Sequence, residues 1–234
     1  MTSIKTSKVP VFLKVRTCPP TIPEGDQVIF LIADFNVFPE IPVSHEELNR
    51  ASQMKSVNAR KAFLAGRRVI RYSLSRWLAL NPLDISIRVS PEGAPYFEGA
   101  GMPLFSISHS SELVMVALSR NPVGADLERE RALDMVSLAD RFFSKEESLF
   151  VRGKNDLGIF FRLWTCREAA IKADGRGMAR LLPSTNVRFE DECVASAEVG
   201  GGEWKVAHAM IDQSYHAAIA GRQLPSLIHW CDLR

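Results

Sequence analysis

Two short stretches, residues 123–128 and 163–172, constrain this chain more than any other part of its sequence. The first reads Val-Gly-Ala-Asp-Leu-Glu and begins with small and apolar residues, which predicts a mostly buried strand. Side chains two positions apart on a strand point to the same face, so Asp126 and Glu128 share one face. Two carboxylates on a buried strand need a partner, and a cation is the simplest one.

The second stretch predicts a helix on which Trp164, Glu168 and Lys172 form one stripe, because they are spaced four residues apart. If this stripe faces the strand, Glu168 joins the two strand carboxylates. Three carboxylates repel one another unless a hard cation neutralises them, and an all-oxygen ligand set suits Mg²⁺. Taken alone, each stretch also fits an ordinary alternative, namely exposed strand residues or a surface ion pair.

Four motifs follow one another between residues 105 and 172. The chain carries F-x-x-S-H-S at 105–110, V-G-x-D-x-E at 123–128, F-S-x-x-E at 143–147 and W-x-x-x-E-x-x-x-K at 164–172. Together they resemble the signature of 4′-phosphopantetheinyl transferases of the surfactin-synthetase (Sfp-like) type. A single motif of this kind is weak evidence, whereas the ordered set is specific.

The resemblance implies a reaction, a cofactor and partners. Enzymes of this family take the phosphopantetheine arm of coenzyme A and attach it to a serine of an acyl or peptidyl carrier protein, releasing 3′,5′-ADP. The reaction depends on Mg²⁺, which holds the pyrophosphate and neutralises charge on the phosphoryl oxygens. The family fold that the resemblance implies is a pair of similar α/β halves with the site between them.

The resemblance also assigns site residues. The implied metal ligands are the three carboxylates Asp126, Glu128 and Glu168. The implied catalytic residues are Glu168 as general base for the serine hydroxyl, Lys172 as the cation beside the leaving phosphate, and Asp126. Coenzyme A is expected to contact Ser108, His109, Lys172 and one upstream basic residue, either Arg60 or Lys61.

Two positions depart from the family pattern. The family usually has G-K-P in the turn before the S-H-S block, whereas this chain has Gly93-Ala94-Pro95. Its helical arginine usually lies directly before an F-L-A-G-R-like run, and here that position is Ala62, which leaves Arg60 or Lys61 as the substitute. Both changes weaken the expected coenzyme A site. A non-catalytic protein that binds coenzyme A or a carrier domain is therefore an alternative, and a Mg²⁺-dependent phosphodiesterase is a third hypothesis.

A basic helical region opens at the capping box Ser44-His45-Glu46-Glu47 and ends before Asn81-Pro82. No acidic residue lies between this box and Asp84, and Arg60, Arg67 and Arg71 fall on one helical face. Such a region is either a solvated basic face or a surface that attracts phosphates or an acidic protein. The basic residues are Arg50, Lys55, Arg60, Lys61, Arg67, Arg68, Arg71 and Arg76.

The order of the elements predicts two halves. In the first, an edge strand at 11–15 and a buried strand at 28–33 precede the basic helices and the strands at 84–89, 105–110 and 113–118. In the second, the strand at 123–128 precedes a capping box at 144–147, a helix that Gly175 ends, and strands at 187–189, 204–207, 214–219 and 227–230. We therefore predict an α+β fold of two similar α/β halves in a pseudo-twofold arrangement, each a small, mostly antiparallel sheet packed with helices. The halves are expected at residues 1–121 and 122–234.

Composition narrows the partners and the compartment. The net charge of +2 argues against nucleic acid or a membrane surface as a partner. The four cysteines include no C-x-x-C pair and are expected to be reduced thiols. No secretory signal and no apolar run of membrane length is recognisable, so the expected location is the cytoplasm. A chain that fuses both halves is expected to work as a monomer.

Overall fold

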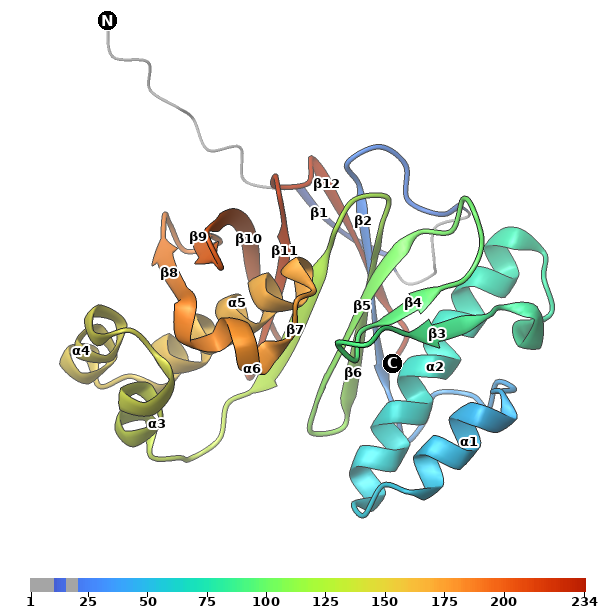
Figure 1. The fold of residues 1–234 in the computed structure, drawn as a ribbon, viewed down its shortest axis with the longest axis horizontal. Coiled ribbons are helices and arrows are strands. Elements are labelled where there is room, and N and C mark those ends of the chain that lie inside the picture. Colours follow the sequence, from blue (N-terminus) through green and yellow to red (C-terminus); the bar gives the residue numbers. More distant parts are fainter. Residues whose placement is uncertain (1–10, 16–20) are drawn as a thin grey trace, which may run out of the picture.

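Two packed β-sheets form the centre of the molecule. The structure is a computed structural model that describes residues 11–15 and 21–234. In these residues two five-stranded sheets lie face to face, and a long helix covers the outer face of each (Figure 1). Helix α2 (Val57–Leu78) covers the first sheet and helix α5 (Leu157–Asp174) covers the second. The predicted α+β class is confirmed.

The first sheet has the strand order β1-β12-β2-β6-β5. Strand β12 pairs in parallel with β1 and β2, whereas β2, β6 and β5 are antiparallel neighbours. The last strand of the chain, β12, thus belongs to the first sheet. All other strands of the first sheet come before the expected boundary at residues 121 and 122, and all strands of the second sheet come after it. The strands are β1 (Val11–Val15), β2 (Val28–Asp34), β5 (Leu104–Ser110), β6 (Leu113–Ser119) and β12 (Leu227–Asp232).

Strand β1 is an edge strand, as predicted for residues 11–15. Strand β2 is buried on both faces, because Phe30 contacts the second sheet while Ile29 and Leu31 pack under α2. This double burial explains why its sequence is a continuous apolar run rather than an alternating one.

The second sheet is antiparallel throughout, with the order β7-β11-β10-β9-β8. Its strand β9 was not expected from the sequence. The residues of β9 are mostly alanine, serine and valine without clear alternation, and they form a strand because β8 and β10 pair with both of its edges. The strands are β7 (Gly124–Arg129), β8 (Thr185–Phe189), β9 (Val194–Val199), β10 (Gly202–Ile211) and β11 (Tyr215–Gly221).

Shorter elements surround the sheets. Both predicted capping boxes are present, at Ser44 before α1 and at Ser144 before α4, and Gly175 ends α5 with a φ of 80°. Among the described residues, no helix is both long enough and apolar enough to cross a membrane. The remaining elements are α1 (His45–Ser52), η1 (Pro82–Asp84), β3 (Ile87–Val89), β4 (Pro95–Phe97), α3 (Met135–Phe142), α4 (Lys145–Lys154), α6 (Met178–Leu181) and η2 (Leu182–Ser184).

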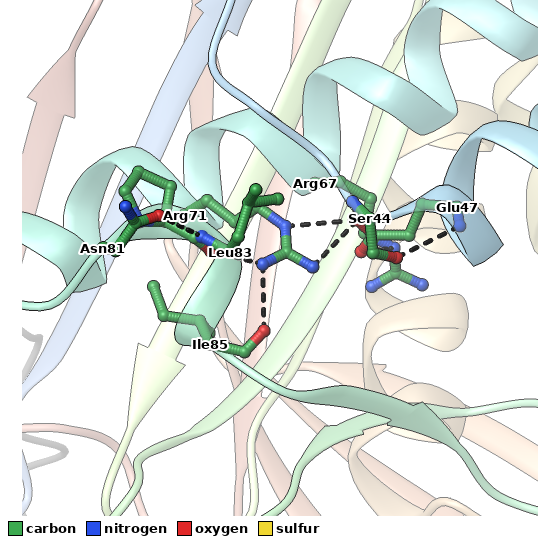
Figure 2. A network of polar contacts seen from close by, with 8 residues as sticks. Ser44, Glu47, Arg67, Arg71, Asn81, Leu83 and Ile85 are labelled. Atoms are coloured by element: carbon green, nitrogen blue, oxygen red, sulfur yellow. Dashed lines mark hydrogen bonds and ion pairs between the residues drawn. The ribbon is translucent and has the colours of Figure 1, made fainter.

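A buried glutamate–arginine pair anchors each long helix. In the first half, Arg71 on α2 donates Nε and Nη2 to Oε2 of Glu47 at 3.1 and 2.8 Å (Figure 2). In the second half, Arg167 on α5 donates Nη2 to Oε2 of Glu147. Both glutamates belong to capping boxes and also accept a hydrogen bond from the backbone of the N-cap serine. This repeated contact agrees with the predicted likeness of the two halves.

The basic region of the first half is not a solvated face along its whole length. Arg67 and Arg71 are only 5% and 2% exposed, and both face Glu47. The interpretation of a solvated face is therefore wrong for these two side chains. Their acidic partner is Glu47, which lies in the capping box before the stretch without acidic residues. The sequence of the helix itself therefore does not reveal this pairing.

Candidate active site

Strand β7 and helix α5 touch without any side chain between them at Gly124. A Cβ atom on Gly124 would lie 1.9 Å from the carbonyl oxygen of Ala169 and 2.3 Å from the backbone nitrogen of Ala173. Only glycine fits such an approach. The contact brings Glu168 and Lys172, which flank it on the helix, next to the carboxylate of Asp126 two residues along the strand.

Asp126 is the buried centre of the site, with an exposed fraction of 2%. Its Oδ1 accepts hydrogen bonds from Nζ of Lys172 at 2.5 Å and from the hydroxyl of Ser108 at 2.7 Å. The same ammonium lies 3.9 Å from Oε2 of Glu168. The structure thus brings together the predicted residues of the strand, the helix and the S-H-S block.

Glu128 lies on the same face of β7, nearer the solvent. Its Oε2 accepts hydrogen bonds from the hydroxyl of Ser110 at 3.0 Å and from Nη1 of Arg131 at 2.9 Å. Ser110 and Arg131 were not expected from the sequence. A signal for Ser110 exists, because it alternates with Ser108 along a strand and so must share its face.

The electrostatics of the cluster follow from its burial. Burial, together with the negative charges of Asp126 and Glu128, raises the pKa of Glu168 to about 7, although Lys172 opposes this shift. Trp164 contributes a hydrogen bond to Glu168, which accounts for the helical stripe seen in the sequence. Burial alone would lower the pKa of Lys172, but Asp126 and Glu168 outweigh it and raise that pKa. The lysine is therefore a permanent cation.

The carboxylates fit an additional hard cation. Within residues 11–15 and 21–234, no three His, Cys, Asp or Glu side chains stand as a ready-made metal site. However, Oδ2 of Asp126 is buried without any hydrogen-bond donor, and burial together with the negative charges of Asp126 and Glu128 raises the pKa of Glu168. A divalent cation with oxygen ligands would relieve both. The metal ligands Asp126, Glu128 and Glu168 stay a prediction.

A cavity of about 410 Å³ opens beside the cluster and is lined by both halves. His109 of β5 and Lys172 of α5 contribute to its wall, as does Ala94 in the turn that departs from the family pattern. A second, smaller hollow is formed by the carboxylate cluster itself, and His109 and Lys172 line that one too. The two spaces are therefore neighbours that share a histidine and a lysine.

The upstream basic residues lie differently from the expectation. Arg60 donates to the backbone oxygen of Met54, and Lys61 donates to the side chain of Asn36. Neither lines the cavity within the described part of the chain, whereas Arg50 and Arg67 both do. The contact of Arg60 or Lys61 with coenzyme A stays a prediction, and Arg50 and Arg67 are the basic residues of the first half that line the cavity among the described residues.

Arg67 is a buried cation whose hydrogen bonds are incomplete. Its Nε and Nη1 are buried without a hydrogen-bond partner, and Nε lies 3.6 Å from Oε1 of Glu47, beyond hydrogen-bond length. Oε2 of that glutamate is already used by Arg71. Burial lowers the pKa of Arg67 to about 10, and the nearby charges of Arg50 and Arg71 act in the same direction. An anion in the cavity would complete this arrangement.

Known proteins resemble this chain. A family model described as the 4′-phosphopantetheinyl transferase superfamily matches residues 122–220. The 4′-phosphopantetheinyl transferase HetI of a Nostoc species is 33% identical over 192 residues, which cover 70% of this chain and 81% of that protein. The 4′-phosphopantetheinyl transferase Sfp of Bacillus subtilis is 29% identical over 180 residues, covering 70% and 80%.

Among solved structures, a holo-(acyl-carrier-protein) synthase from Bacillus anthracis in complex with CoA (3′,5′-ADP) is 23% identical, with a TM-score of 0.33. The match covers 39% of this chain and 91% of that one. A likeness this slight carries no conclusion about the site.

Proposed function

Because this chain belongs to the 4′-phosphopantetheinyl transferase family, we propose that it moves the phosphopantetheine arm of coenzyme A to a serine of an acyl or peptidyl carrier protein. The observation that supports this proposal best is the position of Lys172. Lys172 joins the carboxylates of Asp126 and Glu168 and also lines the cavity between the halves. A pyrophosphate whose nucleotide occupies this cavity therefore meets both the cation and the candidate base.

The residues that would hold Mg²⁺ are Asp126, Glu128 and Glu168. When bound, Mg²⁺ supplies positive charge to the pyrophosphate and to the oxygens that become more negative in the transition state. Oδ2 of Asp126, buried without a donor, supports this assignment.

The chain's own residues account for the proton and for the leaving group. The carrier serine Oγ attacks the pantetheine-bearing phosphorus, and the bond from this phosphorus to the oxygen of 3′,5′-ADP breaks. Glu168, whose Oε2 lies 3.9 Å from Nζ of Lys172, takes the proton of the serine hydroxyl. Lys172 stays charged beside Asp126 and stabilises the negative charge that the leaving 3′,5′-ADP acquires.

Arg50 and Arg67, together with His109, are proposed to hold the other phosphate of coenzyme A, which is the 3′-phosphate of its ribose. A comparison of the two halves supports Arg67. The anchoring arginine of α2 has Arg67 four residues before it, whereas Leu163 holds that place in α5. Because α5 is anchored by Arg167 and Glu147 without a second arginine at this place, we infer that the charge of Arg67 is available to a ligand. The guanidinium of Arg67 would thus replace the cationic contacts that are missing because this chain has Ala62 and Ala94 where the family usually has basic residues.

A single chain contributes to the site from both sheets, with Ser108 on β5 and Asp126 on β7. We therefore propose that the protein acts as a monomer, and the cytoplasm remains the expected compartment. The basic helix α2 keeps Arg60 and Lys61 exposed, where they are available to an acidic carrier domain.

Variants of the candidate base and lysine test the proposal. Glu168→Gln and Lys172→Met are expected to fold and to lose at least about a hundredfold in transfer rate, followed as the mass gain of an apo carrier protein. Glu198→Gln, on an exposed position of β9, is the matched control and should keep full activity. A Glu168→Gln protein with undiminished transfer would contradict the assignment of the base.

A further inference from the structure

Strands β5 and β7 meet at the junction of the two halves, but they belong to different sheets and are not joined by a backbone ladder. Instead, the side chains of three alternate serines of β5 connect the two strands by hydrogen bonds. They are at most 9% exposed, and each is hydrogen-bonded to β7: Ser106, Ser108 and Ser110.

The outer two serines accept hydrogen bonds from the backbone of β7. The hydroxyl of Ser106 accepts from the N–H of Ala125 at 2.9 Å, and the hydroxyl of Ser110 accepts from the N–H of Arg129 at 3.0 Å. These contacts satisfy donors at the edge of β7 that would otherwise be unpaired. They hold the halves together and by themselves indicate only a structural role.

The hydroxyl protons of two of the serines go to carboxylates. Ser108 donates to Oδ1 of Asp126 at 2.7 Å, and Ser110 donates to Oε2 of Glu128 at 3.0 Å. A hydroxyl has one proton, so each serine commits its only donor to one carboxylate oxygen. For Asp126, this leaves Oδ2 as the oxygen without a donor.

We infer that Ser108 and Ser110 are positioning residues, which orient Asp126 and Glu128 so that their remaining oxygens are presented to a divalent cation. This inference rests on the proposed function. It means that the first half of the chain sets the metal affinity of ligands carried by the second. It also gives a further role to Ser108, which is expected to contact coenzyme A and whose hydroxyl donates its proton to Asp126.

Ser106 provides an internal control. It lies on the same strand, faces the same way and is equally buried, but its contact is with a backbone N–H and with no carboxylate. Removing its hydroxyl therefore damages the junction and leaves both carboxylates oriented. Ser106 also lines the large cavity, so metal affinity rather than transfer is the suitable measurement.

The test is the affinity of the full-length protein for Mn²⁺, measured from the electron paramagnetic resonance signal of the free ion in the absence of coenzyme A. Outer-shell partners of metal ligands are typically worth about ten- to a hundredfold in metal affinity. Ser108→Ala and Ser110→Ala are therefore expected to weaken Mn²⁺ binding about tenfold or more. Ser106→Ala should stay within about twofold of the natural protein, and Ser110→Thr should restore binding because it keeps a hydroxyl.

Urea unfolding of every variant separates positioning from loss of structure, because Ser106→Ala and Ser110→Ala each lose one backbone contact across the junction. Equal Mn²⁺ affinity in all variants, or an equal loss in Ser106→Ala, overturns the inference, as does a natural protein that binds no Mn²⁺. The two alanine variants near the carboxylates are measured separately, so either one decides if the other fails to fold. Mass gain of a carrier protein with the natural enzyme is recorded in parallel, and its absence counts against the proposed function instead.

Discussion

Gly124 on β7 and Ala169 on α5 are in direct backbone contact, and this contact brings the two parts of the site together. A Cβ atom on Gly124 would lie 1.9 Å from the carbonyl oxygen of Ala169. Because the strand carries Asp126 and the helix carries Glu168 and Lys172, the separation of strand and helix sets the distance from the carboxylate of Asp126 to the lysine and to Glu168.

Gly124→Ala is expected to push α5 away from β7 and to cost about 3 kcal/mol or more of unfolding free energy, since the obstructing atoms belong to a backbone. The rate of transfer should also fall in protein that is still folded, because Lys172 loses its contact with Asp126. Gly153→Ala is the matched control. Nothing lies within 4 Å of a Cβ atom there, and the helical alanine should stabilise the protein by about 0.5–1 kcal/mol. Chemical denaturation checks both values, and an unchanged midpoint for Gly124→Ala would contradict the contact.

Arg67→Gln is expected to weaken the binding of coenzyme A about ten- to a hundredfold, because a charge-assisted hydrogen bond is worth about 1.5–3 kcal/mol. Dephospho-coenzyme A, which lacks the 3′-phosphate, should bind this variant and the natural protein nearly equally. Arg60→Gln and Lys61→Gln on the same helix serve as controls and should change neither affinity. Isothermal titration calorimetry measures all of these constants. A loss in the two controls with none in Arg67→Gln would restore the expectation from the sequence.

Arg167→Met is expected to destabilise the protein by about 3–5 kcal/mol, because it leaves the buried carboxylate of Glu147 without its cation. Changing Glu147 to Leu in the same protein should recover part of this loss. The matching change in the first half, Arg71→Met, should behave alike, since Arg71 pairs with the capping-box glutamate of that half. Urea unfolding is the measurement, and a loss below about 1 kcal/mol would show that the repeated pair is not an anchor.

His208 should make the fold sensitive to acid. Burial lowers its pKa from 6.5 to about 3, and its Nε2 lies 3.0 Å from Nδ1 of the buried His216. Between pH 6.5 and about 3 the unfolded chain binds a proton that the folded protein does not, so stability falls as the pH is lowered through this window. The contribution of His208 amounts to about 2 kcal/mol by pH 5.

The unfolding free energy of the natural protein and of His208→Gln, measured from pH 7.5 to pH 5, checks this prediction. The variant should lose less stability on acidification, by about the same 2 kcal/mol. His45→Gln, at the exposed start of α1, is the control and should follow the natural protein. Parallel curves for all three proteins would mean that His208 is not held neutral by the fold.

Much of the fold was accessible from the sequence because local signals agreed with the final structure. The capping boxes at Ser44 and Ser144, the left-handed glycine that ends α5, and the period of β5 and β7 are all local, and each is present where predicted. The predicted family and enzyme class are confirmed by the relatives. Asp126, Glu168 and Lys172 meet as expected because two regular elements with known periods face each other.

The parts that sequence did not reveal depend on contacts between distant segments. Strand β12 joins the first sheet between β1 and β2, and no local pattern tells which sheet a strand at the end of the chain will enter. Arg50 and Arg67 line the cavity because α1 folds back onto α2, whereas Arg60 and Lys61 point elsewhere. Helical spacing alone places Arg60 and Arg67 on the same face, and only the packing of the helices shows which of them lines the cavity.

The most direct measurement of the central claim is the intact mass of an apo carrier protein after incubation with this protein, coenzyme A and Mg²⁺. The account predicts that one phosphopantetheine is added per carrier, that a chelator abolishes the addition, and that 3′,5′-ADP is released in equal amount. A panel of fatty-acid, polyketide and peptide-synthetase carriers would rank the natural acceptors. An unmodified mass for every carrier, with coenzyme A bound but intact, would contradict the transferase account and favour a protein that only binds coenzyme A.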